Sequence, residues 1–199
     1  NHTFNVADGA AAVDLQLNAN LTDQYPEIGW VPASNFIKAG AGSVVLSGSN
    51  SYDGVTDIVS GILTAANSSA LGAGGWSGAT MTWIRNGATL ALQGGVSLDE
   101  HLHLLGTGVG GQGALRSISG NNALTLTYGG SGSGPGFCFD GDSTVGVDAD
   151  VLTVTGFYQD TGSFGLTKVG NGTLHIRGTN NYSGATTVNA GTLRLGNGS

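Results

Sequence analysis

The sequence predicts an all-β protein in which short strands are stacked on one another. Apolar side chains recur two residues apart, as at Leu174 and Ile176, with polar residues between them. This is the pattern of a strand that buries one face. Glycine accounts for 37 of the 199 residues and only 10% are charged, and no run of ten or more residues carries an apolar stripe at helical spacing. A unit of such strands also occurs twice, which indicates a stack, because strands this short cannot bury their own faces.

The unit is clearest at residues 165–199, which contain three short strands separated by glycine turns. The positions predicted to face inward are Leu174 and Ile176, Thr186 and Val188, and Leu193 and Leu195. The glycines between these strands are Gly172, Gly178, Gly184 and Gly191. They fall where the chain must turn, and glycine tolerates the positive φ that such turns need.

The same unit occurs at residues 36–69. Ten residue pairs match at a single offset of 130 positions, as Lys38 and Lys168 do. The first copy supplies Lys38, Gly40, Gly42, Gly48, Asn50, Tyr52, Gly54, Thr56, Gly61 and Leu63, and the second supplies Lys168, Gly170, Gly172, Gly178, Asn180, Tyr182, Gly184, Thr186, Gly191 and Leu193. These residues are predicted to be structural, the asparagines satisfying backbone groups of a turn and the tyrosines packing over the next turn of the stack.

Residues 166–195 closely resemble the autotransporter-associated β-strand repeat, also called the passenger-associated transport repeat, of bacterial surface proteins. The copy at 37–66 is a looser match, in which Val45, Asp53, Val55, Asp57 and Ile62 replace the more usual Thr, Gly or Ala. The resemblance implies a right-handed parallel β-helix (β-solenoid) that is exported and displayed at the cell surface or outside the cell. It implies no catalytic, cofactor-binding or metal-binding residues.

We expect residues 1–199 to form one elongated β-solenoid domain. Residues 1–35 are interpreted as a partial repeat unit, 36–69 as the first clear repeat, 70–164 as spacer turns and 165–199 as the second repeat. Turns of roughly 20 to 25 residues would give about eight to ten of them. Because each end of a stack leaves backbone groups unpaired, we expect either continuation in a longer parent chain or end-to-end self-association into a fibre.

The N-terminal elements follow the same rules. A strand is predicted at 1–6, and a second one where Val13, Leu15 and Leu17 alternate with polar residues. Residues 23–32 show no alternation and predict a loop that leaves the stack.

In the spacer region the apolar pattern predicts several strands and one exception. A strand is expected at 80–84, inward pairs at Leu90 and Leu92 and at Leu124 and Leu126, and a flexible loop at 131–136. The alternation predicts that one face of the chain here carries Val96, Leu98, Leu102 and Leu104. Glu100 falls on the same face. Because an unpaired carboxylate is costly in a core, we expect a bulge or turn near Asp99 and Glu100 that keeps Glu100 out of it.

Charge and cysteine content exclude some functions. The net charge of −7, with six scattered basic residues, argues against a nucleic-acid partner, which needs clustered Lys and Arg. No stretch predicts a membrane span or a signal peptide. The single cysteine, Cys138, cannot form an internal disulfide and is interpreted as a small buried residue rather than a nucleophile.

Two clusters of ionisable residues suggest metal binding, and each has a structural explanation. His101 and His103 would share a face of a strand, and Asp99 could complete a ligand set. The alternative is that these ionisable side chains simply face solvent at the edge of a turn of the stack, while Leu102 and Leu104 face inward. A calcium site is suggested by Asp140, Asp142, Asp148 and Asp150. Their spacing matches neither an EF-hand nor the glycine-rich nonapeptide pattern, and turn-forming aspartates are favoured.

The predicted function is structural: a stiff rod or fibre building block of a bacterial cell-surface protein. One alternative is an adhesin that binds glycan or a host surface through a lateral face, with Trp30, Trp76 or Trp83 stacked on sugar rings, although tryptophans at such corners usually serve packing. A second alternative is a carbohydrate-active enzyme, but no pair of carboxylates stands out as the catalytic groups that it would need.

Overall fold

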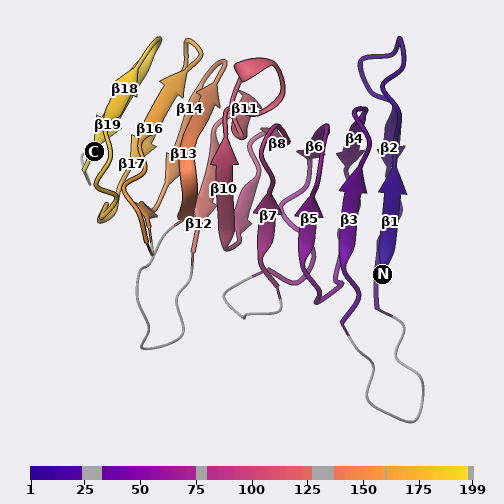
Figure 1. The fold of residues 1–199 in the computed structure, drawn as a ribbon. Coiled ribbons are helices and arrows are strands. Elements are labelled where there is room, and N and C mark those ends of the chain that lie inside the picture. Colours follow the sequence, from indigo (N-terminus) through magenta and orange to yellow (C-terminus); the bar gives the residue numbers. More distant parts are fainter. Residues whose placement is uncertain (24–32, 75–79, 127–136, 160, 197–199) are drawn as a thin grey trace.

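The computed structural model describes residues 1–23, 33–74, 80–126, 137–159 and 161–196, which form a stack of short parallel strands (Figure 1). The two termini lie at opposite ends of this stack. All strand pairings among the described residues are parallel, and the one helical element there is a short 3₁₀ turn, η1 (Val109–Gly111). The predicted all-β, parallel β-solenoid is therefore confirmed.

The strands form three ladders along the stack, here called faces 1, 2 and 3, and one circuit of the chain around them is called a rung. Face 1 contains β1 (His2–Asn5), β3 (Phe36–Ala39), β5 (Thr56–Ile58), β7 (Thr82–Ile84), β10 (Leu102–Gly106), the first part of β13 (Phe137–Val147) and β15 (Phe157–Tyr158). Face 2 contains β2 (Leu15–Leu17), β4 (Ser43–Leu46), β6 (Ile62–Ala65), β8 (Thr89–Gln93), β11 (Leu115–Ser119), the second part of β13, β16 (Leu166–Val169) and β18 (Thr186–Val188). Face 3 contains β9 (Ser97–Asp99), β12 (Asn122–Thr125), β14 (Val151–Val154), β17 (Thr173–Ile176) and β19 (Thr192–Leu195).

The interior is filled by apolar side chains that recur at one position of successive rungs. On face 2, Val44, Leu63, Leu90, Leu115 and Val145 are aligned from strand to strand. All five are fully buried. Burying one such side chain contributes about 1.5 to 3 kcal/mol relative to leaving it in water. The inward positions predicted from the alternation therefore form the continuous core of the stack.

The last strands depart from the predicted burial. Leu174 and Ile176 are fully buried as expected, but Val188 and Leu195 are 46% and 64% exposed. Leu195 is aligned with Ile176, so it keeps the predicted parity. It is exposed because the described residues place no further rung over β18 and β19.

The two repeat copies lie on different faces of the stack. Lys38 is aligned with Ile58 on face 1, whereas Lys168 is aligned with Val145 on face 2. The change occurs at β13, an 11-residue strand whose first part pairs with β10 and β15 and whose second part pairs with β11 and β16. The second repeat is thus displaced by one face around the axis relative to the first.

Glu100 corrects one prediction. The expected turn is present, because β9 ends at Asp99 on face 3 and β10 begins at Leu102 on face 1. Glu100 nevertheless points inward and is 2% exposed. The expectation that it avoids the core was wrong because Thr82 of the preceding rung supplies a donor, its Oγ1 lying 2.9 Å from Oε1 of Glu100. Burial, with a smaller contribution from Asp99, raises the pKa of Glu100 well above its usual 4.5.

Candidate functional site

The two repeat lysines are buried and donate hydrogen bonds to the backbone. Lys38 Nζ lies 3.0, 2.7 and 2.9 Å from the carbonyl oxygens of Ala39, Gly40 and Ser60. Lys168 repeats this geometry at 2.8, 2.7 and 3.2 Å from those of Val169, Gly170 and Ala190. Each ammonium group has three N–H donors, and three carbonyls accept them. Because the third carbonyl belongs to the next rung, each lysine fastens two successive turns together.

Burial disfavours the charged form of both lysines, and it lowers their pKa values. Both side chains are 0% exposed. Asp14 offsets this effect at Lys38, and Asp148 does so at Lys168. The lysines therefore lie in sites where their charge is held by fixed carbonyl dipoles rather than by water.

The repeat asparagines form hydrogen bonds with backbone groups, and the repeat tyrosines form hydrogen bonds with threonine hydroxyl groups. Asn50 Oδ1 accepts from the Leu21 N–H at 2.9 Å, and its Nδ2 donates to the Ala70 carbonyl at 2.6 Å, so it bridges the rungs on either side. Asn180 Oδ1 accepts from the Phe157 N–H at 3.0 Å. The hydroxyl groups of Tyr52 and Tyr182 bond to Thr56 and Thr186 at 2.7 and 2.8 Å.

The repeat glycines lie where neighbouring backbone leaves no room for a side chain. A Cβ at any of them would lie less than 3.0 Å from a backbone atom of another segment. They are Gly40, Gly42, Gly48, Gly54, Gly61, Gly170, Gly172, Gly178, Gly184 and Gly191. Together with the lysines, they allow the turns of adjacent rungs to approach closely.

The outward side chains of face 1 form a row of aromatic and ionisable groups. In register from strand to strand, this row comprises Asp57, Trp83, His103, Cys138 and Tyr158, and we call it the face-1 row. The Trp83 and His103 rings are stacked with their centroids 3.9 Å apart. The row thus combines a stacked aromatic pair with one thiol and one carboxylate on neighbouring strands.

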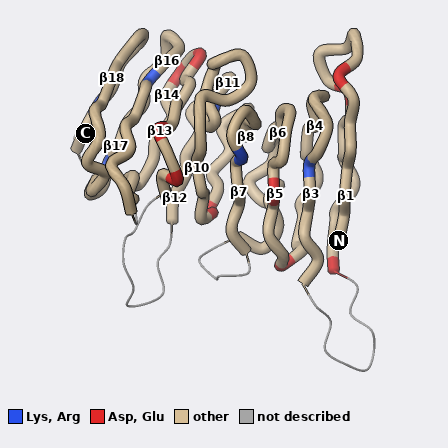
Figure 2. Tube along the Cα trace, in the orientation of Figure 1, with Lys and Arg blue, Asp and Glu red and all other residues tan. Residues whose placement is uncertain are grey.

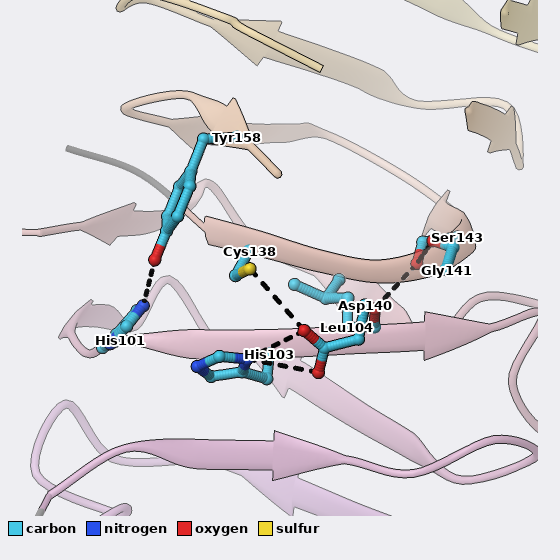
Figure 3. A network of polar contacts seen from close by, with 8 residues as sticks. All are labelled: His101, His103, Leu104, Cys138, Asp140, Gly141, Ser143 and Tyr158. Atoms are coloured by element: carbon cyan, nitrogen blue, oxygen red, sulfur yellow. Dashed lines mark hydrogen bonds and ion pairs between the residues drawn. The ribbon is translucent and has the colours of Figure 1, made fainter. Parts of the chain in front are cut away.

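The predicted set of Asp99, His101 and His103 does not come together as one ligand group. Asp99 is an exposed residue of β9 on face 3. His101 lies at the corner before β10, where its Nε2 is 2.7 Å from the Tyr158 hydroxyl (Figure 3). The His101 and His103 rings remain near each other, with centroids 4.9 Å apart. The chain turns from face 3 to face 1 between Asp99 and Leu102, and this turn separates Asp99 from the two histidines.

His103 is grouped instead with Cys138 and Asp140 of β13. Its Nδ1 lies 3.0 Å from Oδ1 and 3.2 Å from Oδ2 of Asp140. The Cys138 thiol donates to Asp140 Oδ1 at 3.6 Å. Figure 3 shows the three side chains converging at the surface of β10 and β13. Cys138 is buried, 1% exposed, as predicted.

Sequence reasoning missed this group. One signal was present, because Cys138 and Asp140 are two residues apart and therefore share a face of a strand. The missing information was the pairing of β13 with β10, which aligns His103 with Cys138.

Trp83 is largely engaged by the protein itself. The Arg85 guanidinium lies 4.8 Å from the centroid of the indole ring, in addition to the stacked His103. Arg85 also forms an ion pair with Asp57, with Nε 2.8 Å from Oδ1, and this hydrogen bond raises the pKa of Arg85. Trp30 and Trp76 lie outside the described residues.

The aspartates considered for calcium do not converge on one point. Asp142 and Asp150 each accept a backbone N–H, from Gly165 and Gly120, at 2.8 Å. Asp148 is paired with Arg116 at 2.6 Å. Among the described residues, acidic and basic side chains are dispersed along the stack (Figure 2). The described part of the chain contains no helix long and apolar enough to cross a membrane.

A groove of about 600 Å³ lies on face 3. It is lined by Thr125, Thr153, Thr155, Arg177 and Thr179, together with apolar atoms of their neighbours. The Thr155 hydroxyl is buried and has no hydrogen-bond partner among the described residues. The groove therefore offers hydroxyl groups and one guanidinium to a polar ligand.

Comparisons with known proteins agree with the repeat architecture. The model of the passenger-associated-transport-repeat family matches residues 36–68 and 166–195. The adhesin BmaC autotransporter of Brucella suis biovar 1 (strain 1330) is 33% identical over 180 residues, which cover 90% of this chain and 4% of that protein. This chain thus spans a small part of the length of that relative. No solved structure matches.

Proposed function

We propose that this chain is a rigid spacer within the passenger of an exported bacterial autotransporter, because two of its segments match the passenger-associated-transport-repeat model and an autotransporter adhesin is 33% identical over 180 of its residues. A spacer holds other parts of a passenger at a fixed distance from the cell. Such a role needs a continuous, stiff stack and no reactive group.

The observation that carries the proposal is the unbroken ladder of face 2. It runs through β2, β4, β6, β8, β11, β13, β16 and β18, each paired with the next. Eight strands at about 4.8 Å spacing give roughly 34 Å along the axis. Backbone hydrogen bonds, the buried ladder of aliphatic side chains and the lysine contacts all resist bending of this stack.

Distance measurement by electron spin resonance tests the stiffness. Nitroxide labels at Gln16→Cys on β2 and Thr187→Cys on β18, in a Cys138→Ala background, should give one narrow distribution. Its mean should lie near 34 Å, lengthened by the label arms. A broad distribution, or a mean below about 20 Å, would show that the stack bends and would contradict the spacer role.

The ends of the stack are the places where we propose that further rungs dock. Val188 and Leu195 expose apolar surface at the end formed by β18 and β19. The proposed occupant is another rung of the same polypeptide. This agrees with the comparison, in which the chain covers only 4% of the length of the adhesin relative. End-to-end association of separate copies would use the same surface.

Sedimentation distinguishes these two cases. If separate copies associate, the sedimentation coefficient of the chain rises with concentration, and Val188→Lys with Leu195→Lys abolishes the rise. If only a covalently continuous rung fits, the chain stays monomeric at all concentrations, and a longer chain that supplies the next rung unfolds at higher urea.

A second candidate function is binding of a glycan or host surface. The relative is named an adhesin, and the face-3 groove has a buried hydroxyl without a partner among the described residues. A glycan array separates the two roles, because a pure spacer should bind no sugar. Binding that is lost in Arg177→Ala would support the adhesin role, and binding retained in that variant would place it elsewhere on the chain.

The proposal assigns no catalysis to the chain. Glycoside cleavage needs two carboxyl groups that face each other across an open site. Asp140, Asp142, Asp148 and Asp150 are each held by a separate partner in the structure. Release of reducing sugars from an oligosaccharide panel would contradict this part of the proposal.

A further inference from the structure

The grouping of His103, Cys138 and Asp140 has the composition of a transition-metal site. An imidazole, a thiol and a carboxyl group together suit a borderline ion such as Zn²⁺, whereas Mg²⁺ and Ca²⁺ prefer oxygen ligands alone. The three ligand atoms all lie within 4.8 Å of one another. This composition is not explained by the spacer role, which needs none of these groups.

The fold brings the three residues together by strand pairing. His103 of β10 is aligned with Cys138 of β13, and Asp140 lies two residues further along β13. The register between the two strands then shifts, so that Gly106 is aligned with Ser143. Irregularities of this kind redirect side chains and are frequent beside functional sites. The irregularity begins just beyond Leu104, next to the group.

Two of the three distances between ligand atoms are close to those that a tetrahedral ion requires. Ligand atoms about 2.0 to 2.3 Å from zinc, at tetrahedral angles, lie roughly 3.3 to 3.8 Å from one another. Asp140 Oδ1 lies 3.0 Å from His103 Nδ1 and 3.6 Å from Cys138 Sγ. Side-chain adjustments of a few tenths of an ångström would bring these two pairs to the required spacing.

The surroundings hold two of the ligands in place and leave one side open. Cys138 is buried, the His103 side chain is 12% exposed, and that of Asp140 is 32% exposed. The His103 ring is held by stacking on Trp83, which fixes its orientation as neighbouring groups do in metal sites. The partly exposed carboxylate leaves room for a water molecule as a fourth ligand.

We propose that His103, Cys138 and Asp140 bind one divalent transition-metal ion, with Zn²⁺ the best match. His103 binds through Nδ1, Cys138 through its thiolate, and Asp140 through one carboxylate oxygen. The thiol proton is released to solvent on binding. The proton shared by His103 Nδ1 and Asp140 is also given up, by exchange through solvent to Nε2 of the ring, so that Nδ1 and the carboxylate oxygen each bind the ion. Water completes the coordination.

Cobalt substitution tests the site in the whole chain. The reduced protein, stripped with a chelator, is titrated with Co²⁺ without oxygen. We expect one ion per chain, a thiolate-to-cobalt charge-transfer band and the intense visible bands of a four-coordinate ion. Zn²⁺ should then displace the cobalt and bleach these bands. Trp83 supplies a second signal, since paramagnetic Co²⁺ beside the stacked His103 should quench its fluorescence in a Trp30→Phe, Trp76→Phe background.

Single variants identify the ligands. Cys138→Ser should abolish the charge-transfer band, and His103→Gln and Asp140→Asn should each weaken Co²⁺ binding at least tenfold. Asp142→Asn, on the same strand but bonded to the Gly165 backbone, is the matched control and should bind as the parent does. Circular dichroism of each metal-free variant establishes that it is folded. Absence of cobalt bands from the folded parent, or bands that persist in Cys138→Ser, would overturn the proposal.

Discussion

At the scale of single residues, the buried lysines are the most specific feature of the repeat. A lysine is seldom fully buried unless its charge is satisfied, and here backbone carbonyls accept all three of its donors in both copies. A methionine has a similar length and no donors, so its introduction at position 38 removes three hydrogen bonds. The Ala39 and Gly40 carbonyls keep the Val6 N–H and the Ser60 hydroxyl as donors, whereas the Ser60 carbonyl loses the lysine.

We predict that Lys38→Met lowers the free energy of unfolding by about 3 kcal/mol, because buried acceptors that lose a charged donor are costly. Lys168→Met should cost less, since its longest contact reaches Ala190 beside the exposed last rung. Urea unfolding measures both, with Arg177→Met, a substitution of an exposed cation, as the control. Equal stability of Lys38→Met and the parent would contradict the proposed fastening of the rungs.

Glu100 predicts a dependence of stability on pH. Because burial raises its pKa in the folded state, the folded state favours the protonated form. Its contribution to stability is therefore complete below the usual pKa of 4.5 and is lost as the pH rises through the raised value. Glu100→Gln mimics the neutral form at every pH.

The unfolding free energy of the parent should consequently fall relative to Glu100→Gln as the pH rises from about 4.5 toward neutrality and beyond. Urea titrations of both proteins across this range measure the difference, in which the titration of other groups cancels. A difference that is constant with pH would contradict the raised pKa.

At the scale of elements, the glycine turns set how closely successive rungs approach. Gly61 has φ +73°, and a Cβ there would lie 2.5 Å from the Gly40 carbonyl oxygen and 2.6 Å from Lys38 Nζ. Gly87 has φ +82°, but a Cβ there would meet nothing within 4 Å. Alanine substitutions at Gly61 and Gly87 can therefore be compared to separate the cost of backbone strain from the cost of steric collision.

We predict that Gly87→Ala costs about 1 kcal/mol, which is the penalty of a left-handed backbone for a residue with Cβ. Gly61→Ala should cost several kcal/mol, because strain, collision and disturbance of the Lys38 contacts add. Urea unfolding of the two variants measures this contrast. Equal losses of unfolding free energy in the two variants would indicate that the close approach of the rungs does not restrict which residue can occupy position 61.

At the scale of the whole molecule, stability should decline from the middle of the stack toward its ends. Strands such as β6 and β8 are paired on both sides, whereas β18 and β19 are each paired on one side and expose Val188 and Leu195. In a stack, each rung is stabilised mainly by its neighbours.

Hydrogen exchange followed by mass spectrometry should therefore show the slowest exchange in β6, β8 and β11 and the fastest in β1, β18 and β19. A variant with Lys168→Met should speed exchange in β18 and β19 more than in β6. Uniform protection along the chain would mean that the stack unfolds as one unit and would contradict this gradient.

The sequence by itself determined the period of the fold. Alternation at Leu174 and Ile176 identified inward positions, the offset between Lys38 and Lys168 identified the repeat, and glycine placed the turns. These signals are local, because the side chain that faces inward depends only on the period of a strand.

Only the tertiary structure decided which strands meet. It moved the second repeat by one face at β13, turned Glu100 inward toward Thr82, and aligned His103 with Cys138. The physical reason is that alternation fixes the direction of a side chain but not the strand that stacks above it. That choice depends on the length of each connection and on the packing of the whole stack, which no short stretch of sequence contains.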